Sequence, residues 1–265
     1  VLTGEELRFS GTLQLSDALA TRPGISISRN GPPGTRTTVR IRGLDSDYIP
    51  VFLNGIDVSD PSSTQTSFDF GALPGAAATR VEILRGSQGP IFGSEAIAGV
   101  INIDTSLAPD APGTEVTASV EAGSYETVIG TLGVGMRSDF GSLSFSATRV
   151  VTEGFSAADE NDGNTEADGH RSTTLTLVGD VAATDDLTLG FSAFYIDSST
   201  EIDGFPAPAF ALTDTDDIGE AERYGARVSA AFTGFGIDHE VALSGSRTDR
   251  ETAGSGANSF FTGDR

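Results

Sequence analysis

Residues 80–103 read RVEILRGSQGPIFGSEAIAGVINI, and this stretch organises the rest of the chain. Residues 81–84 alternate between two faces and predict a short strand. Between residues 86 and 93, three glycines and a proline require turns, because glycine reaches positive φ at low cost and proline fixes φ. Residues 100–103 predict a second strand. Dense glycine beside β-branched residues therefore indicates a small module with closely packed backbones.

Composition narrows the classes of function. The 265 residues carry a net charge of −22, and all 16 basic residues are arginines. Such a charge argues against nucleic acid as a partner and favours a solvated surface or bound divalent cations. The chain has no cysteine, which removes disulfides and thiolate chemistry. No apolar run is long enough for a membrane helix, and the start at Val1 leads us to expect a processed or truncated product.

Most of the negative charge lies after residue 110, and the texture changes near Pro109–Pro112. We therefore expect one domain over residues 1–108 and another over residues 109–265. In the first, the pattern predicts a helix over 10–20, strands over 25–27, 38–42 and 48–53, and a hairpin at Asn54-Gly55. These elements describe a compact mixed α/β module.

Four motifs in this module carry a family resemblance. VRIRG (39–43), VFLNGI (51–56), RVEILRG (80–86) and IFGSEAIAGVINI (91–103) resemble, in order and spacing, the plug domain of TonB-dependent outer-membrane receptors. DPSS (60–63) and FDF (68–70) are most similar to the cobalamin-receptor group. The resemblance implies a bacterial outer-membrane location, a small-molecule ligand and import driven by TonB, whose energy-coupling box would precede Val1.

The second domain is built of alternating segments of about ten residues. Seven are predicted, over 114–123, 126–136, 142–152, 172–182, 187–197, 222–233 and 238–249. Such segments suit transmembrane β-strands, although a soluble β-sandwich also alternates. The loops over 153–171 and 198–221 are long and acidic while the other turns are short, which favours a barrel. The resemblance implies a 22-stranded barrel, so the predicted fold is a mixed α/β plug followed by antiparallel transmembrane β-barrel strands covering the first third of the wall.

Three groups of candidate site residues follow. Turn-rich plug loops would face an extracellular ligand, and neutral donors and acceptors there suit a large polar molecule such as a corrinoid; ordinary turn chemistry is the simpler reading. These residues are Asn30, Thr35, Asp47, Ser62, Ser63 and Gln65.

The acidic loops are candidate calcium sites, since Ca²⁺ takes oxygen ligands from flexible loops; the resemblance to cobalamin receptors supports this for Asp168 and Asp214. The candidate ligands are Asp159, Asp162, Asp168, Asp214 and Asp216. A solvated acidic surface, or a bridge through divalent ions to lipopolysaccharide, is the alternative. No other cofactor is expected.

Arginines of the plug form the third group. At least one of Arg40, Arg42, Arg80 and Arg85 is expected to pair with a wall acid such as Glu115 or Glu121, and to act as a latch between plug and wall.

Catalysis is not expected, because no nucleophile–base or phosphate-loop motif is present. His170 and His239 are expected to face solvent. The predicted function is import of cobalamin or another corrinoid, with TonB and outer-membrane lipid as partners. A ferric-siderophore receptor, a passive surface or pore protein, and a soluble β-rich binding protein are the alternatives.

Overall fold

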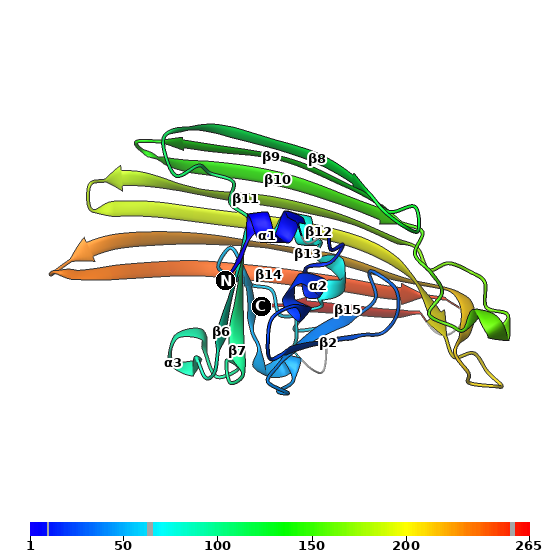
Figure 1. The fold of residues 1–265 in the computed structure, drawn as a ribbon. Helices are drawn as coiled ribbons and strands as arrows, with labels where there is room; N and C mark the ends of the chain where they lie inside the picture. The colour runs from blue at the N-terminus through cyan, green and yellow to red at the C-terminus, as the bar shows by residue number, and fades with distance from the viewer. Residues whose placement is uncertain (10, 63–65, 255–257) are drawn as a thin grey trace.

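A computed structural model describes residues 1–9, 11–62, 66–254 and 258–265. It shows a small plug lying against the concave face of a long curved sheet, called the wall below (Figure 1). No helix in the described ranges is long and apolar enough to cross a membrane.

The plug is built on a five-stranded sheet of order β1-β6-β7-β4-β5. Its strands are β1 (Leu2–Thr3), β4 (Val51–Leu53), β5 (Ile56–Asp57), β6 (Arg80–Arg85) and β7 (Gly99–Asp104). The predicted strands of the opening stretch pair antiparallel, with Val81 opposite Ile103. β7 also pairs in parallel with β4, which puts Leu53 beside Ile103. These three apolar side chains are buried in the plug core.

The glycines of the opening stretch have two different roles. Gly86 and Gly93 adopt φ values of 93° and 90°, and a Cβ on either would meet nothing within 4 Å. Only Gly99 is required by packing, since a Cβ there would lie 2.3 Å from the Leu84 carbonyl oxygen. Close packing explains one glycine, and turn conformation explains the other two.

The remaining plug elements surround this sheet. A separate hairpin joins β2 (Ile25–Arg29) to β3 (Thr37–Ile41). The Asn54-Gly55 hairpin is confirmed: both residues have positive φ, 51° and 79°, and they connect β4 to β5. Short helices complete the plug: α1 (Gly4–Phe9), α2 (Leu15–Ala20), η1 (Ser46–Tyr48), η2 (Phe70–Ala72), η3 (Gly75–Ala77) and α3 (Gly89–Phe92). The helix predicted over 10–20 is therefore shorter, and α1 was not predicted.

The wall is one antiparallel sheet in which each strand pairs with the next along the chain. Its strands are β8 (Gly113–Ala122), β9 (Val128–Ser138), β10 (Gly141–Thr152), β11 (His170–Thr184), β12 (Leu187–Gly204), β13 (Thr213–Gly234), β14 (Ile237–Ala253) and β15 (Ser259–Asp264). The described residues form eight wall strands rather than the predicted seven, because β15 was not predicted. β12, β13 and β14 extend well beyond their predicted ends. The second long loop is consequently short, over residues 205–212, and Asp214 and Asp216 belong to β13.

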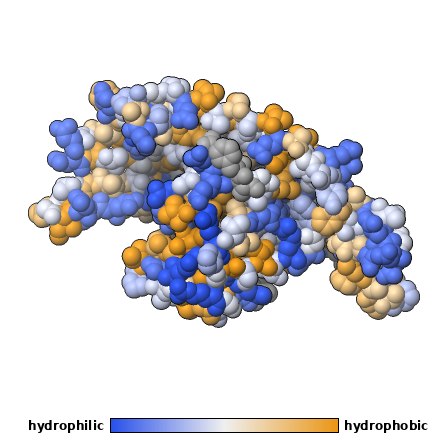
Figure 2. All heavy atoms as spheres, in the orientation of Figure 1, coloured by the Kyte–Doolittle hydropathy of each residue, from blue (hydrophilic) through white to orange (hydrophobic). Residues whose placement is uncertain are grey.

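The two faces of the wall differ in polarity as the alternation predicts. Outward rows carry exposed apolar side chains such as Leu132, Val228 and Leu243. On β12 and β13 this apolar band finishes, toward the long-loop end, at the paired tyrosines Tyr195 and Tyr224, whereas on β8 to β10 the exposed Val120, Val128 and Val151 continue it. Figure 2 shows hydrophilic and apolar residues side by side over the loops at that end, on the right. The inward face is mostly hydroxylic, except that Phe194 and Ile196 join the plug core.

Candidate plug–wall interface and ligand-facing loops

The loop over residues 30–36 lies at the long-loop end of the plug and packs directly on the wall. A Cβ on Gly31 would lie 3.1 Å from the Cβ of Ala157, and one on Gly34 would lie 2.1 Å from His170 Nδ1. The Thr200 hydroxyl donates to the Gly34 carbonyl at 3.3 Å. Glycine is required at position 34 by this close approach and by its φ of 93°.

His170 is part of this contact. It is buried, and its Nδ1 lies 2.8 Å from Thr200 Oγ1. The prediction that His170 faces solvent is therefore wrong: it opens β11 with its side chain on the inward face, in line with Ser172 and Thr174. His239 is half-buried and stacks on Phe232 with ring centroids 5.1 Å apart.

The predicted ligand residues of the plug have different environments. Asn30 is exposed, whereas Thr35 is buried and donates to the Pro32 carbonyl at 2.8 Å. Ser62 Oγ donates to Asp60 and accepts from Arg250, so it forms part of a contact with the wall. Ser63 and Gln65 lie outside the described residues. Of this group, Asn30 has the clearest access to a ligand.

Asp47 is a half-buried carboxyl with Oδ1 unpartnered among the described residues. Burial, followed by the charge of Asp45, raises the pKa of Asp47, while Arg36 lowers it. Arg36 also donates to Ser67 Oγ at 3.3 Å. This arginine therefore connects the loop over 30–36 with the one that precedes η2.

Carboxylates collect where the wall loops meet. Asp203 Oδ2 accepts from Ser156 Oγ at 3.0 Å and from the Ala158 amide at 2.7 Å. Asp214 Oδ1 accepts from the same Ser156 hydroxyl at 3.3 Å. Asp168 Oδ2 accepts from the Ala157 amide at 2.9 Å. The segment 156–158 thus draws together acids from the loop, β12 and β13.

One carboxyl of this group, that of Asp168, has a strongly raised pKa. Burial raises the pKa of Asp168 to about 6 despite the hydrogen bond from Ala157, and the charges of Asp203, Glu166 and Asp214 add to the rise.

Asp159 is separate: it is exposed and caps the short helix η4 (Glu160–Asp162) through the Asn161 amide. Within the described ranges, no three His, Cys, Asp or Glu side chains are arranged to hold a metal ion. Calcium binding stays a prediction from sequence.

Ion pairs do join plug and wall, but with the charges reversed from the prediction. Arg250 of β14 pairs with Asp60 at 3.0 Å, and Arg265 pairs with Asp57 at 2.7 Å. Arg265 also reaches Glu95 at 2.6 Å. The wall supplies the cations and the plug supplies the anions.

The predicted plug arginines form local contacts instead. Arg40 pairs with Asp45 at 3.4 Å, and Arg80 pairs with Glu82, both within the plug. Arg42 and Arg85 are exposed and form no ion pair with the described residues. Among the described residues none of the four pairs with a wall acid, so the predicted latch is not present: Arg40 and Arg80 are engaged by local acids of the plug instead.

Arg223 is the least satisfied of the wall arginines. Its side chain is 4% exposed, and its Nη2 lies 3.7 Å from Asp69 Oδ2. Its Nε and Nη1 are buried and find no hydrogen-bond partner in the described part of the chain. Asp69 is fully engaged on its other oxygen, which accepts from the Thr37 and Gly71 amides at 2.9 Å each.

A neutral hydrogen-bond network crosses the interface near the plug hairpin. Asn54 exchanges two side-chain hydrogen bonds with Thr105, each 2.9 Å long. The Thr105 hydroxyl donates to Thr176 of the wall at 2.9 Å, and Ser192 donates to the Asn54 carbonyl at 2.9 Å. An amide at position 54 both donates and accepts here, which a carboxylate could not do.

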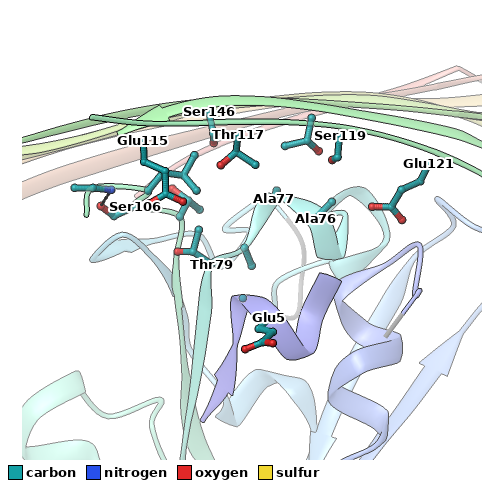
Figure 3. Close-up of a pocket in the computed structure, with 16 residues that line it drawn as sticks. Glu5, Ala76, Ala77, Thr79, Ser106, Glu115, Thr117, Ser119, Glu121 and Ser146 are labelled. Atoms are coloured by element: carbon teal, nitrogen blue, oxygen red, sulfur yellow. Dashed lines mark hydrogen bonds between the residues drawn. The ribbon is translucent and has the colours of Figure 1, made fainter. Parts of the chain in front are cut away.

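A cavity of about 260 Å³ separates the plug from the first wall strands. Figure 3 shows Glu115, Thr117 and Ser119 extending from the wall toward the plug segment that carries Ala76 and Ala77. Among the described residues that line this cavity there is no arginine. The plug and wall are thus joined by hydrogen bonds around β4 and β5. Beside β8 the interface is open and is lined by polar and small side chains.

A plug seated against the polar inner face of an antiparallel wall defines the class: a plug domain followed by strands of a partial barrel. The family model described as "TonB-dependent Receptor Plug Domain" matches residues 1–100, the part of the chain that forms most of the plug.

Solved structures share the fold over nearly the whole chain. The siderophore receptor PirA from Acinetobacter baumannii aligns with 99% of this chain and 43% of its own length, at 18% identity and a TM-score of 0.72. A mutant of the ferric enterobactin receptor PfeA from Pseudomonas aeruginosa, in complex with enterobactin, aligns with 98% and 44% at 17% identity and a TM-score of 0.71. The copper transporter OprC aligns with 90% and 44% at 16% identity and a TM-score of 0.58. The chain spans less than half the length of each.

Proposed function

We propose that this chain is the plug and first wall strands of a bacterial outer-membrane receptor that binds a ferric siderophore and imports it with energy supplied through TonB. The observation that carries the proposal is a plug of the TonB-dependent family held on the polar face of a wall whose other face is apolar. In lipid every backbone group needs a partner, and a closed wall of strands supplies one.

A ferric siderophore is preferred to the corrinoid expected from sequence. PirA is a siderophore receptor and PfeA is a ferric enterobactin receptor, and both share the fold over nearly all of this chain. The copper transporter OprC shows that one fold serves more than one cargo, so the cargo has to be tested directly.

Electrostatics limit the net charge of the ferric chelate that such a receptor would bind. The net charge is −22, and acids crowd the wall loops at the end where a ligand would arrive. Like charges in a ligand and its entrance oppose association and slow encounter. We therefore propose a chelate with little or no negative charge.

The loop over residues 30–36 is the proposed ligand-facing part of the plug. Gly34→Ala would place a Cβ 2.1 Å from His170 Nδ1 and displace the loop. Gly24→Ala is the matched control: Gly24 also has positive φ, 75°, but a Cβ there would meet only the Arg42 side chain at 3.7 Å. Both variants carry a similar backbone penalty, so only Gly34→Ala should weaken ligand binding.

The test is equilibrium binding to the full-length receptor, with ferric hydroxamates, ferric catecholates and cyanocobalamin compared side by side. We expect binding of a ferric chelate of low charge, weakened in Gly34→Ala and retained in Gly24→Ala. Binding of cyanocobalamin alone would restore the corrinoid prediction. Binding of none of them would favour a passive surface or pore protein.

A further inference from the structure

Two arginines lie next to each other on the outer face of the wall, near its long-loop end. The register pairs Arg149 of β10 with Thr173 of β11, and Val151 with Arg171. Arg149 and Arg171 are therefore diagonal neighbours on adjoining strands, about 7–8 Å apart at their Cα atoms. Both point away from the plug, and both are exposed.

Neither arginine is neutralised by the chain. No carboxylate of the described residues lies within 4.0 Å of either guanidinium, and Arg149 donates only to the Thr173 hydroxyl. The next outward acid across the sheet is Asp197, which lies opposite Thr173 and is therefore a diagonal neighbour of Arg171, about 7–8 Å away at the Cα atoms, although the two side chains form no ion pair. Arg247, by contrast, faces the same way and pairs with Asp249 at 3.0 Å. Two neighbouring arginines without an acidic partner are unusual in a chain with a net charge of −22.

A shallow apolar groove of about 400 Å³ begins at Arg149 and runs over β8, β9 and β10. Its outward lining includes Val120, Leu132 and Ala147. Gly130 lies in the same outward row as Arg149 and leaves a notch, since a Cβ there would meet nothing within 4 Å. The groove is thus apolar along its length and positively charged at the end nearer the long loops.

We infer that Arg149, Arg171 and the groove at Gly130 bind one lipid with a phosphorylated headgroup, with the phosphate on the two guanidinium groups and an acyl chain in the groove. This rests on the proposed function only in requiring the wall to span a membrane. Arginine donates in a planar fork that fits phosphate oxygens, and apolar surface favours an acyl chain. Beside the arginines, on β11 to β13, the apolar band gives way to a polar row of Thr173, Asp197 and Glu222, which is where a headgroup resides.

The test uses the full-length receptor, stripped of lipid in detergent, and native mass spectrometry with bisphosphorylated lipid A or its dephosphorylated form with the same acyl chains. The variants are Arg149→Gln/Arg171→Gln, which removes the charge, and Gly130→Phe, which fills the notch, where a Cβ would meet nothing within 4 Å. Arg247→Gln is the control, an outward arginine already paired with acids.

We expect the charge variant to bind phosphorylated lipid A ~10-fold or more weakly, as loss of two charge-assisted contacts implies. Gly130→Phe should weaken both lipid forms, and Arg247→Gln should bind like the unmodified receptor. Equal binding by all variants would overturn the inference, as would inorganic phosphate competing as well as the lipid. A receptor that embeds in the membrane and binds its ferric chelate, yet shows no lipid preference, would refute this inference alone; failure to embed would refute the proposed function.

Discussion

The ion pair between Arg250 and Asp60 should hold the plug segment after β5 against the wall. Asp60 is 5% exposed and Arg250 is 26% exposed in their side chains, with 3.0 Å between Nε and Oδ2. Arg250→Met removes the charge and keeps most of the side-chain length. Breaking a buried pair costs about 3–5 kcal/mol. Because Arg250 is partly solvated and Asp60 still accepts two hydrogen bonds from Ser62, we expect about 2 kcal/mol.

Native-state hydrogen exchange on the full-length receptor measures this cost. A loss of about 2 kcal/mol in local opening free energy speeds exchange of the amides over residues 56–62 about 30-fold. Arg247→Met is the control, since Arg247 lies on the same strand but its pair with Asp249 is exposed and stays within the wall. Such a pair contributes about 0.2–1 kcal/mol and should leave the plug amides unchanged.

A double-mutant cycle isolates the pair itself. Asp60→Asn alone should also speed exchange, and adding it to Arg250→Met should cost less than the sum of the single changes, because the interaction is already lost. Unchanged exchange in Arg250→Met, or an equal increase in Arg247→Met, would refute the reasoning that this pair anchors the plug.

Three further predictions concern other parts of the molecule. The pKa of Asp168 is raised to about 6 in the folded protein, against an ordinary value of 3.8, so the folded loop holds a proton that the unfolded loop has lost. The stability of the loop should therefore fall as pH rises from about 4 to 6 and stay low above that range. Hydrogen exchange over residues 153–169 at a series of pH values should show this fall, and Asp168→Asn should flatten the profile. Calcium should release or absorb heat on titration into the full-length receptor and lose affinity in Asp214→Asn; absence of heat would remove the calcium prediction. Gly55→Ala should destabilise the plug by about 1–2 kcal/mol in urea unfolding, because φ is 79° there and a Cβ would lie 3.2 Å from the Arg227 side chain, whereas Gly123→Ala has neither cost.

Local patterns predicted the sheet and its faces well. The alternation around Tyr224 and Phe191 placed these residues on one side of their strands, and both point outward. Asn54-Gly55 predicted its hairpin because both residues tolerate positive φ. β15 was missed, since its sequence SFFTGD alternates poorly and its pairing with β14 depends on a distant strand.

The contacts between plug and wall were not predictable in the same way. The outward position of Tyr224 implies that Arg223 points inward, yet nothing in the sequence says that its partner is Asp69, far away along the chain. Thr35 and His170 are buried only because the plug loop meets the first residue of β11. Such partners depend on how two domains dock, which alternation and turn residues do not encode.

Uptake of a ferric chelate by whole cells is the most direct test of the proposed receptor function. Cells that carry the full-length receptor should accumulate ⁵⁵Fe from a ferric siderophore of low charge, and deletion of either the receptor or TonB should abolish that uptake. Uptake that persists without TonB, or a receptor that transports cobalamin and no ferric siderophore, would contradict the proposal.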